Sequence, residues 1–297
     1  MWQEYARHLY ARTAGTATAV RYGVAVRGPL PAADWTKGMA CLEFVLDELE
    51  NDGWMVNQSR MWFASHWSVR HHLGWRDGED MLFTHLLDGS RAANRLGWQW
   101  TVGAGTGKAY GFARAQVERR APGLCAGCVL RRECPIQEYP SEPNLERVPA
   151  PPGVLDDLNA EETAGPRSPM TIGNVTHVWL TAESLGDADP ALEAHPELPV
   201  VFVFDERLLA HLHLSAKRLV FLAETLADLA QRRAVEVWRG DPAEVLSGGG
   251  VATTFAPVPG WKRLASRIDP AEVHPWPWLV RPRGGKAGSF SAWRKAV

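Results

Sequence analysis

The chain has 297 residues, of which 45% are hydrophobic and 22% charged, so it has room for two ordinary domains and enough apolar side chains to bury a core. A formal net charge of −2 excludes a uniformly basic nucleic-acid-binding protein, so any contact with nucleic acid must come from a local patch. No apolar run is long enough to cross a bilayer and no signal peptide opens the chain, so we expect a cytoplasmic protein without membrane contact.

The first part of the chain, residues 1–140, is predicted to be helical. Apolar side chains recur at helical spacing in residues 2–9 and 42–49, and again in residues 79–87, where acidic residues occupy the first turn. Fourteen tryptophans is a high number for this length, and most of them lie in the first half. The pattern favours an all-helical domain rich in aromatic side chains.

The second part, residues 174–297, changes period. Short runs rich in β-branched residues surround one long amphipathic stretch, which predicts a Rossmann-like parallel α/β domain with helices on both faces of the sheet. The predicted strands are 176–180, 199–205, 234–238 and 251–255, and the predicted helix is 216–232. Between the two parts, residues 141–173 are rich in proline and acidic side chains and are predicted to form a linker.

The four cysteines suggest a metal centre. Cys125, Cys128 and Cys134 form a C-x₂-C-x₅-C pattern with Pro135 directly after it, and Cys41 stands alone in a predicted helix. Four thiolates can close a tetrahedral zinc site or hold a [4Fe–4S] cluster, and four incidental thiols are the remaining alternative. The cysteine–proline pair favours iron–sulfur, as does the absence of a second C-x₂-C pair, which zinc sites commonly have.

Residues 88–114 contain the most informative motif. Trp98 and Trp100 flank one glutamine, behind a loop that carries Asp88 and Asn94. Paired indoles on a polar loop suit a site that stacks flat aromatic groups, although a corner of a hydrophobic core is the alternative for any isolated pair. Together with its neighbours, the stretch resembles the DNA photolyases and cryptochromes, whose flavin-binding domain carries a similar Asp-Gly…Ala-Asn…Gly-Trp-Gln-Trp loop.

The resemblance extends over about 140 residues and includes segments 2–10, 51–62 and 74–79. It implies that residues 1–140 form the helical FAD-binding domain of this family. The order of Cys41 and the three later cysteines is similar to that in the iron–sulfur bacterial branch of the family, which implies a [4Fe–4S] cluster on all four. The second half resembles the antenna domain that normally comes first, so the chain is interpreted as a shortened circular permutant.

The resemblance also implies which residues contact FAD. Asn57 and Arg60 match residues beside the isoalloxazine, Asp88 matches the carboxylate that pairs with that arginine, and Asn94 matches the residue that faces the flavin N5. Gln3 stands where the family usually has an arginine. The upstream segment that normally wraps the FAD phosphates has no counterpart; residues 13–21 or a partner chain would have to replace it.

For catalysis, the resemblance assigns four tryptophans. Trp2 and Trp100 would flank the damaged bases, while Trp98 and Trp75 would be the proximal and middle members of an electron relay, with Asn94 at the flavin. The implied activity is that of a photolyase-type lyase, in which light-excited reduced FAD passes an electron to a pyrimidine dimer or (6-4) lesion. The alternative is a non-repairing cryptochrome-like sensor, or a DNA-binding iron–sulfur protein that binds FAD weakly or not at all.

Basic residues near the cysteine loop suggest where DNA would bind. Lys108, Arg114, Arg119 and Arg120 would give a local phosphate-binding face for damaged DNA, single-stranded DNA included. A solvated charged surface is the alternative.

Overall fold

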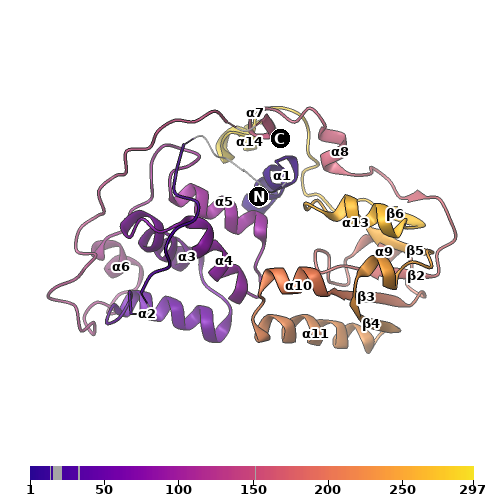
Figure 1. Ribbon diagram of the computed structural model, residues 1–297, viewed down its shortest axis with the longest axis horizontal. Helices are drawn as coiled ribbons and strands as arrows, with labels where there is room; N and C mark the ends of the chain where they lie inside the picture. Colours follow the sequence, from indigo (N-terminus) through magenta and orange to yellow (C-terminus); the bar gives the residue numbers. More distant parts are fainter. Residues whose placement is uncertain (14, 16–21, 33, 151) are drawn as a thin grey trace. The chain divides into compact units, whose positions relative to one another are not determined.

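The computed structural model describes residues 1–13, 15, 22–32, 34–150 and 152–297 (Figure 1). The chain folds into two compact units. The helical unit comprises Ala17–Leu155 and Ala287–Lys295, and the α/β unit comprises Met1–Thr16, Asp156–Lys286 and Ala296–Val297. Most of the segment 13–21, which was considered for the FAD phosphates, lies outside the described residues. The domain boundaries proposed at residues 140 and 173 remain a prediction.

The helical unit is built from short helices joined by loops. Its elements are α2 (Ala40–Asp47), η1 (Glu48–Asp52), α3 (Asn57–Ala64), η2 (Ser65–Arg70), α4 (Trp75–His85), α5 (Arg91–Thr101), α6 (Arg114–Arg120), α7 (Pro152–Leu155) and most of α14 (Phe290–Ala296). The turns η1 and η2 are π-helical and extend α2 and α3 directly. The predicted helices in residues 42–49 and 79–87 are therefore confirmed, although the second ends at His85.

The core of the helical unit follows the predicted apolar faces. Leu42, Val45 and Leu49 are fully buried, as is Leu86 at the end of α4. Helix α5 begins after Ser90, whose hydroxyl accepts a hydrogen bond from the amide of Ala93 at 3.4 Å. Such a cap satisfies one of the free amides of the first turn. The helix carries Trp98 into the centre of this core.

The α/β unit contains a six-stranded sheet in the order β1-β6-β5-β2-β3-β4. Its elements are α1 (Trp2–Arg12), α8 (Ala160–Ala164), β1 (Met170–Thr171), β2 (His177–Leu180), α9 (Pro190–Ala194), β3 (Val200–Asp205), α10 (Glu206–Leu212), α11 (Ala216–Ala230), β4 (Val235–Gly240), α12 (Pro242–Val245), β5 (Val251–Thr254), α13 (Trp261–Ile268) and β6 (Glu272–His274). The five strands from β2 to β6 pair in parallel, and β1 pairs antiparallel at one edge. The four predicted strands and the long helix are confirmed.

Both faces of this sheet are covered (Figure 1). Val178 and Phe202 pack in one cluster with residues of α9 and α11, whereas Trp179 and Val201 pack in another with residues of α12 and α13. This alternation follows from the two-residue period of a strand. Numbered from β2 to β6, the parallel strands have the order 3-2-1-4-5, which is the Rossmann order. The sequence pattern therefore predicted the correct class of sheet.

Helix α1 lies in the α/β unit, although its sequence was assigned to the helical domain. Glu4 Oε1 accepts hydrogen bonds from the amides of Leu279, at 2.9 Å, and Val280, at 3.3 Å. His8 Nε2 donates to the carbonyl of Val280 at 2.8 Å. Burial lowers the pKa of His8 to about 4, and the nearby cation of Arg12 adds to this effect. A neutral histidine thus helps to fix the first helix.

Within the described part of the chain, no helix combines the length and the apolar character that crossing a bilayer requires.

Candidate functional site

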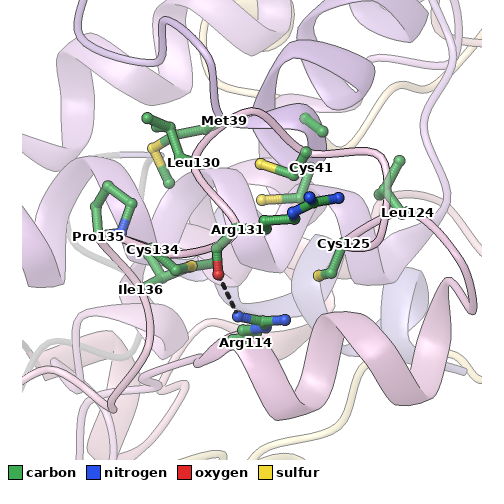
Figure 2. Close-up of a pocket in the computed structure, with 12 residues that line it drawn as sticks. Met39, Cys41, Arg114, Leu124, Cys125, Leu130, Arg131, Cys134, Pro135 and Ile136 are labelled. Carbon is green, nitrogen blue, oxygen red and sulfur yellow. Dashed lines mark hydrogen bonds between the residues drawn. The ribbon is translucent and has the colours of Figure 1, made fainter.

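The four cysteines of the sequence motif line one cavity in the helical unit (Figure 2). Cys41 lies on α2, whereas Cys125, Cys128 and Cys134 lie on the loop after α6. The space between them has an empty volume of about 350 Å³, part of it open to solvent. The other lining residues are Met39, Ala40, Arg114, Leu124, Leu130, Arg131, Pro135 and Ile136. Segments 84 residues apart in sequence (41 to 125) thus meet at this cavity.

Charged side chains hold the cysteine loop by binding its backbone. Arg114 Nη1 donates to the carbonyl of Arg131 at 2.7 Å, as Figure 2 shows, and its Nε donates to Glu118 at 2.8 Å. Arg70 donates from the other side to the carbonyl of Pro135 at 3.1 Å. These bonds fix the path of the loop, so the cavity does not depend on apolar packing alone.

The spacing of the sulfur atoms distinguishes between metals. One tetrahedral zinc ion with sulfur at 2.3 Å requires sulfur atoms about 3.8 Å apart. Among the described residues, no three of these cysteines have sulfur atoms that all lie within 4.8 Å of one another. A four-iron cluster bonds each thiolate to a different iron and therefore spaces the sulfurs more widely. No three of the four described sulfurs are therefore as close as a single zinc ion requires, a spacing compatible with a four-iron cluster.

The protonation of Cys41 also bears on this site. Burial, together with the three neighbouring cysteines, raises the pKa of the Cys41 thiol to about 12. Cys128 Sγ donates a hydrogen bond to the carbonyl of Gly38 at 3.3 Å. The Cys41 thiol is therefore neutral at physiological pH, and its ionisation requires a nearby positive charge such as that of a metal ion.

Arg60 and Asp88 form the expected ion pair. Arg60 Nη2 lies 3.0 and 2.9 Å from the two carboxylate oxygens of Asp88, and Arg60 Nε donates to the carbonyl of Met55 at 3.0 Å. Arg60 comes from α3 and Asp88 from the loop before α5, so two elements fix the orientation of the guanidinium. Both side chains are partly exposed, which leaves them accessible to a ligand.

Asn94 has an unsatisfied amide. The residue is 6% exposed, and among the residues that the structure describes its Nδ2 has no hydrogen-bond partner. Burying such a group without a partner costs about 1–3 kcal/mol. Asn57 begins α3 and is exposed, while Gln3 lies in α1 of the other unit. An orphaned amide on α5 and a fixed guanidinium on α3, two helices in contact with each other, suit a polar heterocycle such as an isoalloxazine.

Trp98 contacts the rings of Trp67 and Phe63, whereas the relay through Trp75 remains a prediction. Trp98 is 2% exposed, and its ring centroid lies 6.5 Å from that of Trp67. Trp67 lies 5.4 Å from Trp35, which is only partly buried. Trp75 is buried at the start of α4, but within the described chain it is not among the rings that contact Trp98, which are those of Trp67 and Phe63. Sequence analysis missed Trp67 and Trp35, because spacing along the chain does not reveal their contact.

The two tryptophans expected beside the damaged bases are accessible. Trp100 is 41% exposed and lies against Tyr110 with ring centroids 5.5 Å apart. Trp2 is 37% exposed and lies 5.6 Å from Tyr5. The two residues belong to different units. That they flank the same damaged bases remains a prediction.

The predicted basic residues separate into two groups. Arg119 and Arg120 are exposed at the end of α6, and Lys108 is exposed 3.9 Å from Glu142. Arg114 instead lines the cysteine cavity, where its hydrogen bonds hold the loop. The position of Arg114 is therefore explained by its structural role in holding the loop, and a contact with DNA is not needed to explain it.

Part of the chain is similar to a known protein family. Residues 2–120 match the model of the FAD binding domain of DNA photolyase. This match supports the photolyase family and FAD as the cofactor. No solved structure matches the chain.

Individual relatives carry the name deoxyribodipyrimidine photo-lyase. The protein of Escherichia coli (strain K12) is 38% identical over 69 residues, which are 23% of this chain and 15% of the relative. That of Streptomyces griseus is 35% identical over 75 residues, covering 24% and 16%. That of Salmonella typhimurium is 32% identical over 115 residues, covering 36% and 24%. The chain thus spans a quarter or less of these relatives.

Proposed function

We propose that the protein is a light-dependent DNA-repair flavoprotein of the photolyase/cryptochrome family, acting on a pyrimidine dimer or a (6-4) lesion. The similarity of residues 2–120 to a photolyase FAD-binding domain supports this proposal. The observation that carries it is the buried amide of Asn94, whose Nδ2 lacks a partner among the described residues. A protein tolerates such a cost where a ligand completes the hydrogen bond.

The residues of the proposed flavin site have separate tasks. Arg60 provides a fixed positive charge for the pyrimidine side of the ring, and Asp88 holds the guanidinium in place so that it does not require the ligand for orientation. Asn94 offers a hydrogen bond at the position that the family resemblance assigns to N5. Bound in reduced form, FAD supplies the electron that opens the crosslinked bases.

An electron relay to the flavin runs, in this proposal, through Trp98, Trp67 and Trp35. Each ring contacts the next, and the last one is partly exposed. In this relay Trp67, not Trp75, is the middle tryptophan. Electron transfer weakens with distance, so the tryptophan whose ring touches Trp98 is the better candidate.

The four cysteines hold a [4Fe–4S] cluster in this proposal, as in the iron–sulfur branch. Their convergence on one cavity supports it, and so does the fact that no three of their sulfur atoms, among the described residues, lie within 4.8 Å of one another. The circular permutation has separate support, since a sheet with Rossmann order follows the segment that matches the FAD-binding domain.

The substrate of the proposed reaction is damaged DNA. Lys108, Arg119 and Arg120 remain candidates for phosphate contacts, and Trp2 and Trp100 for stacking on the extruded bases. A partner chain that completes the FAD phosphate site is part of the same proposal.

The deciding experiment uses the full chain, purified without oxygen, reduced, and illuminated with a dimer-containing oligonucleotide. We expect releasable flavin and restored pyrimidines. Asn94→Leu should abolish repair while leaving stability unchanged or improved, because it removes an unpaired buried amide. Asn51→Ala is the matched control, since Asn51 is exposed and its amide binds only Asp47 in the same helical segment.

Two results would contradict the proposal. Flavin without repair would make the protein a cryptochrome-like sensor. A brown sample without releasable flavin would favour a DNA-binding iron–sulfur protein, which the cysteine cavity supports because it is built independently of Asn94 and Arg60.

A further inference from the structure

A second group of ligand-type side chains lies in the α/β unit and contains none of the residues of the proposed flavin and cluster sites. His195 follows α9, and Glu272 and His274 begin and end β6. Residues two apart in a strand point to the same face of a sheet. Glu272 and His274 thus share one face of β6, and α9 packs against this strand and brings His195 to them. Val273 packs on the opposite face with Trp261 of α13.

Both imidazoles converge on one carboxylate oxygen. His195 Nε2 lies 2.8 Å from Glu272 Oε1, and His274 Nε2 contacts the same oxygen at shorter range. The two rings are nearly perpendicular, with centroids 5.8 Å apart. Among the described residues, these three form the group whose ligand atoms all lie within 4.8 Å of one another.

Neighbouring groups hold the cluster in place. Thr171 donates from its hydroxyl to Glu272 Oε2 at 2.7 Å, which leaves Oε1 for the histidines. Arg233 donates to the carbonyl of His195 at 2.6 Å and so fixes the turn after α9. Oriented ligands of this kind are typical of metal sites, where outer hydrogen bonds set the direction of each ligand atom.

We propose that His195, Glu272 and His274 bind a divalent transition-metal ion of the zinc class through the two Nε2 atoms and Oε1. Zinc bonds nitrogen at 2.0–2.1 Å and oxygen at 2.0–2.2 Å, so its tetrahedral ligand atoms lie about 3.3 Å apart. Both Nε2 atoms now lie closer to Oε1 than that, because they bind it directly, so side-chain rotations that widen these two contacts would admit the ion.

The burial of the three residues describes the kind of site. The side chain of His274 is 5% exposed and that of Glu272 is 11% exposed, whereas that of His195 is 22% exposed. Two histidines and one carboxylate leave a fourth position for water, as in exchangeable and catalytic sites rather than closed structural ones. The partly exposed His195 marks the side from which the ion and water enter.

The test is a titration of the untagged full chain with Co²⁺ under anaerobic conditions. Cobalt held by nitrogen and oxygen gives visible bands without the strong near-ultraviolet absorption of cobalt–thiolate bonds, so this site is distinguishable from the cysteines. We expect one such ion per chain, displaced by Zn²⁺. His195→Ala and His274→Gln should remove these bands, and Thr171→Val should weaken binding about 10–100-fold.

His211→Ala is the matched control, because His211 is an exposed histidine on α10 of the same unit. It should bind cobalt like the unaltered chain, and circular dichroism should show that all variants fold. The proposal is overturned if His195→Ala and His274→Gln retain the nitrogen–oxygen bands with unchanged affinity. It is overturned equally if the unaltered chain shows cobalt–thiolate absorption alone.

Discussion

Replacing Gly78 with alanine tests the packing of Trp98 directly. A Cβ at Gly78 would lie 2.2 Å from Cη2 and 2.6 Å from Cζ3 of Trp98, and neither α4 nor the buried indole has room to move. Gly97 in α5 is the matched control, since a Cβ there meets nothing within 4 Å. Alanine gains about 1 kcal/mol over glycine in a helix interior at both positions. That gain cancels in the comparison and leaves the overpacking cost, about 1–3 kcal/mol.

The measurement is thermal or urea unfolding of both variants, followed by circular dichroism and tryptophan fluorescence. Both glycines lie in the helical unit, so the same transition reports on both. We expect Gly97→Ala to be more stable than the unaltered protein and Gly78→Ala to be less stable than Gly97→Ala by the overpacking cost, or roughly 2–4 °C per kcal/mol. Equal stability of the two variants would show that Trp98 does not pack against α4 as described.

Three further outcomes are expected. Trp67→Phe should slow light-driven reduction of bound flavin by about tenfold or more, which corresponds to at least about 1.4 kcal/mol in the activation barrier. Trp75→Phe should not slow it. If transient absorption shows equal slowing in both variants, the relay through Trp67 is refuted. Asp88→Asn should weaken FAD binding by about 1 kcal/mol, or roughly fivefold in Kd, because Arg60 loses its orienting partner; unchanged flavin occupancy would contradict this. The pKa of His8 is lowered to about 4 from 6.5, so the unfolded chain binds a proton that the folded chain does not. Stability should therefore fall as the pH drops from about 6.5 to 4, by up to about 3 kcal/mol, and His8→Gln should remove that slope in urea titrations.

Much of the fold could be predicted because local patterns determine it. The apolar face of residues 42–49 became the buried side of α2 and η1, and the β-branched runs became β2, β3, β4 and β5. The short strand β6 was missed, since three residues with two polar side chains carry no clear alternation. Its existence depends on pairing with β5, a contact that periodicity does not show.

The site was predictable in part, and for a different reason. The pairing of Arg60 with Asp88 and the gathering of the cysteines followed from a family resemblance, which carries information about three-dimensional contacts. The contact of Trp67 with Trp98 could not be found from sequence, because it depends on tertiary packing between side chains of η2 and α5. The group around Glu272 joins segments 77 residues apart (195 to 272), which no motif connects.

The division of the chain between its two units limits how the protein can be dissected. The backbone passes from one unit to the other after residues 16, 155, 286 and 295. A fragment that stops at residue 140 would therefore separate α1 from Leu279 and Val280, whose amides and carbonyl it binds. Expressing either half alone should yield an incompletely folded product, so genetic truncation cannot assign activities to the halves, and a protease cut in residues 141–150 should leave both fragments associated.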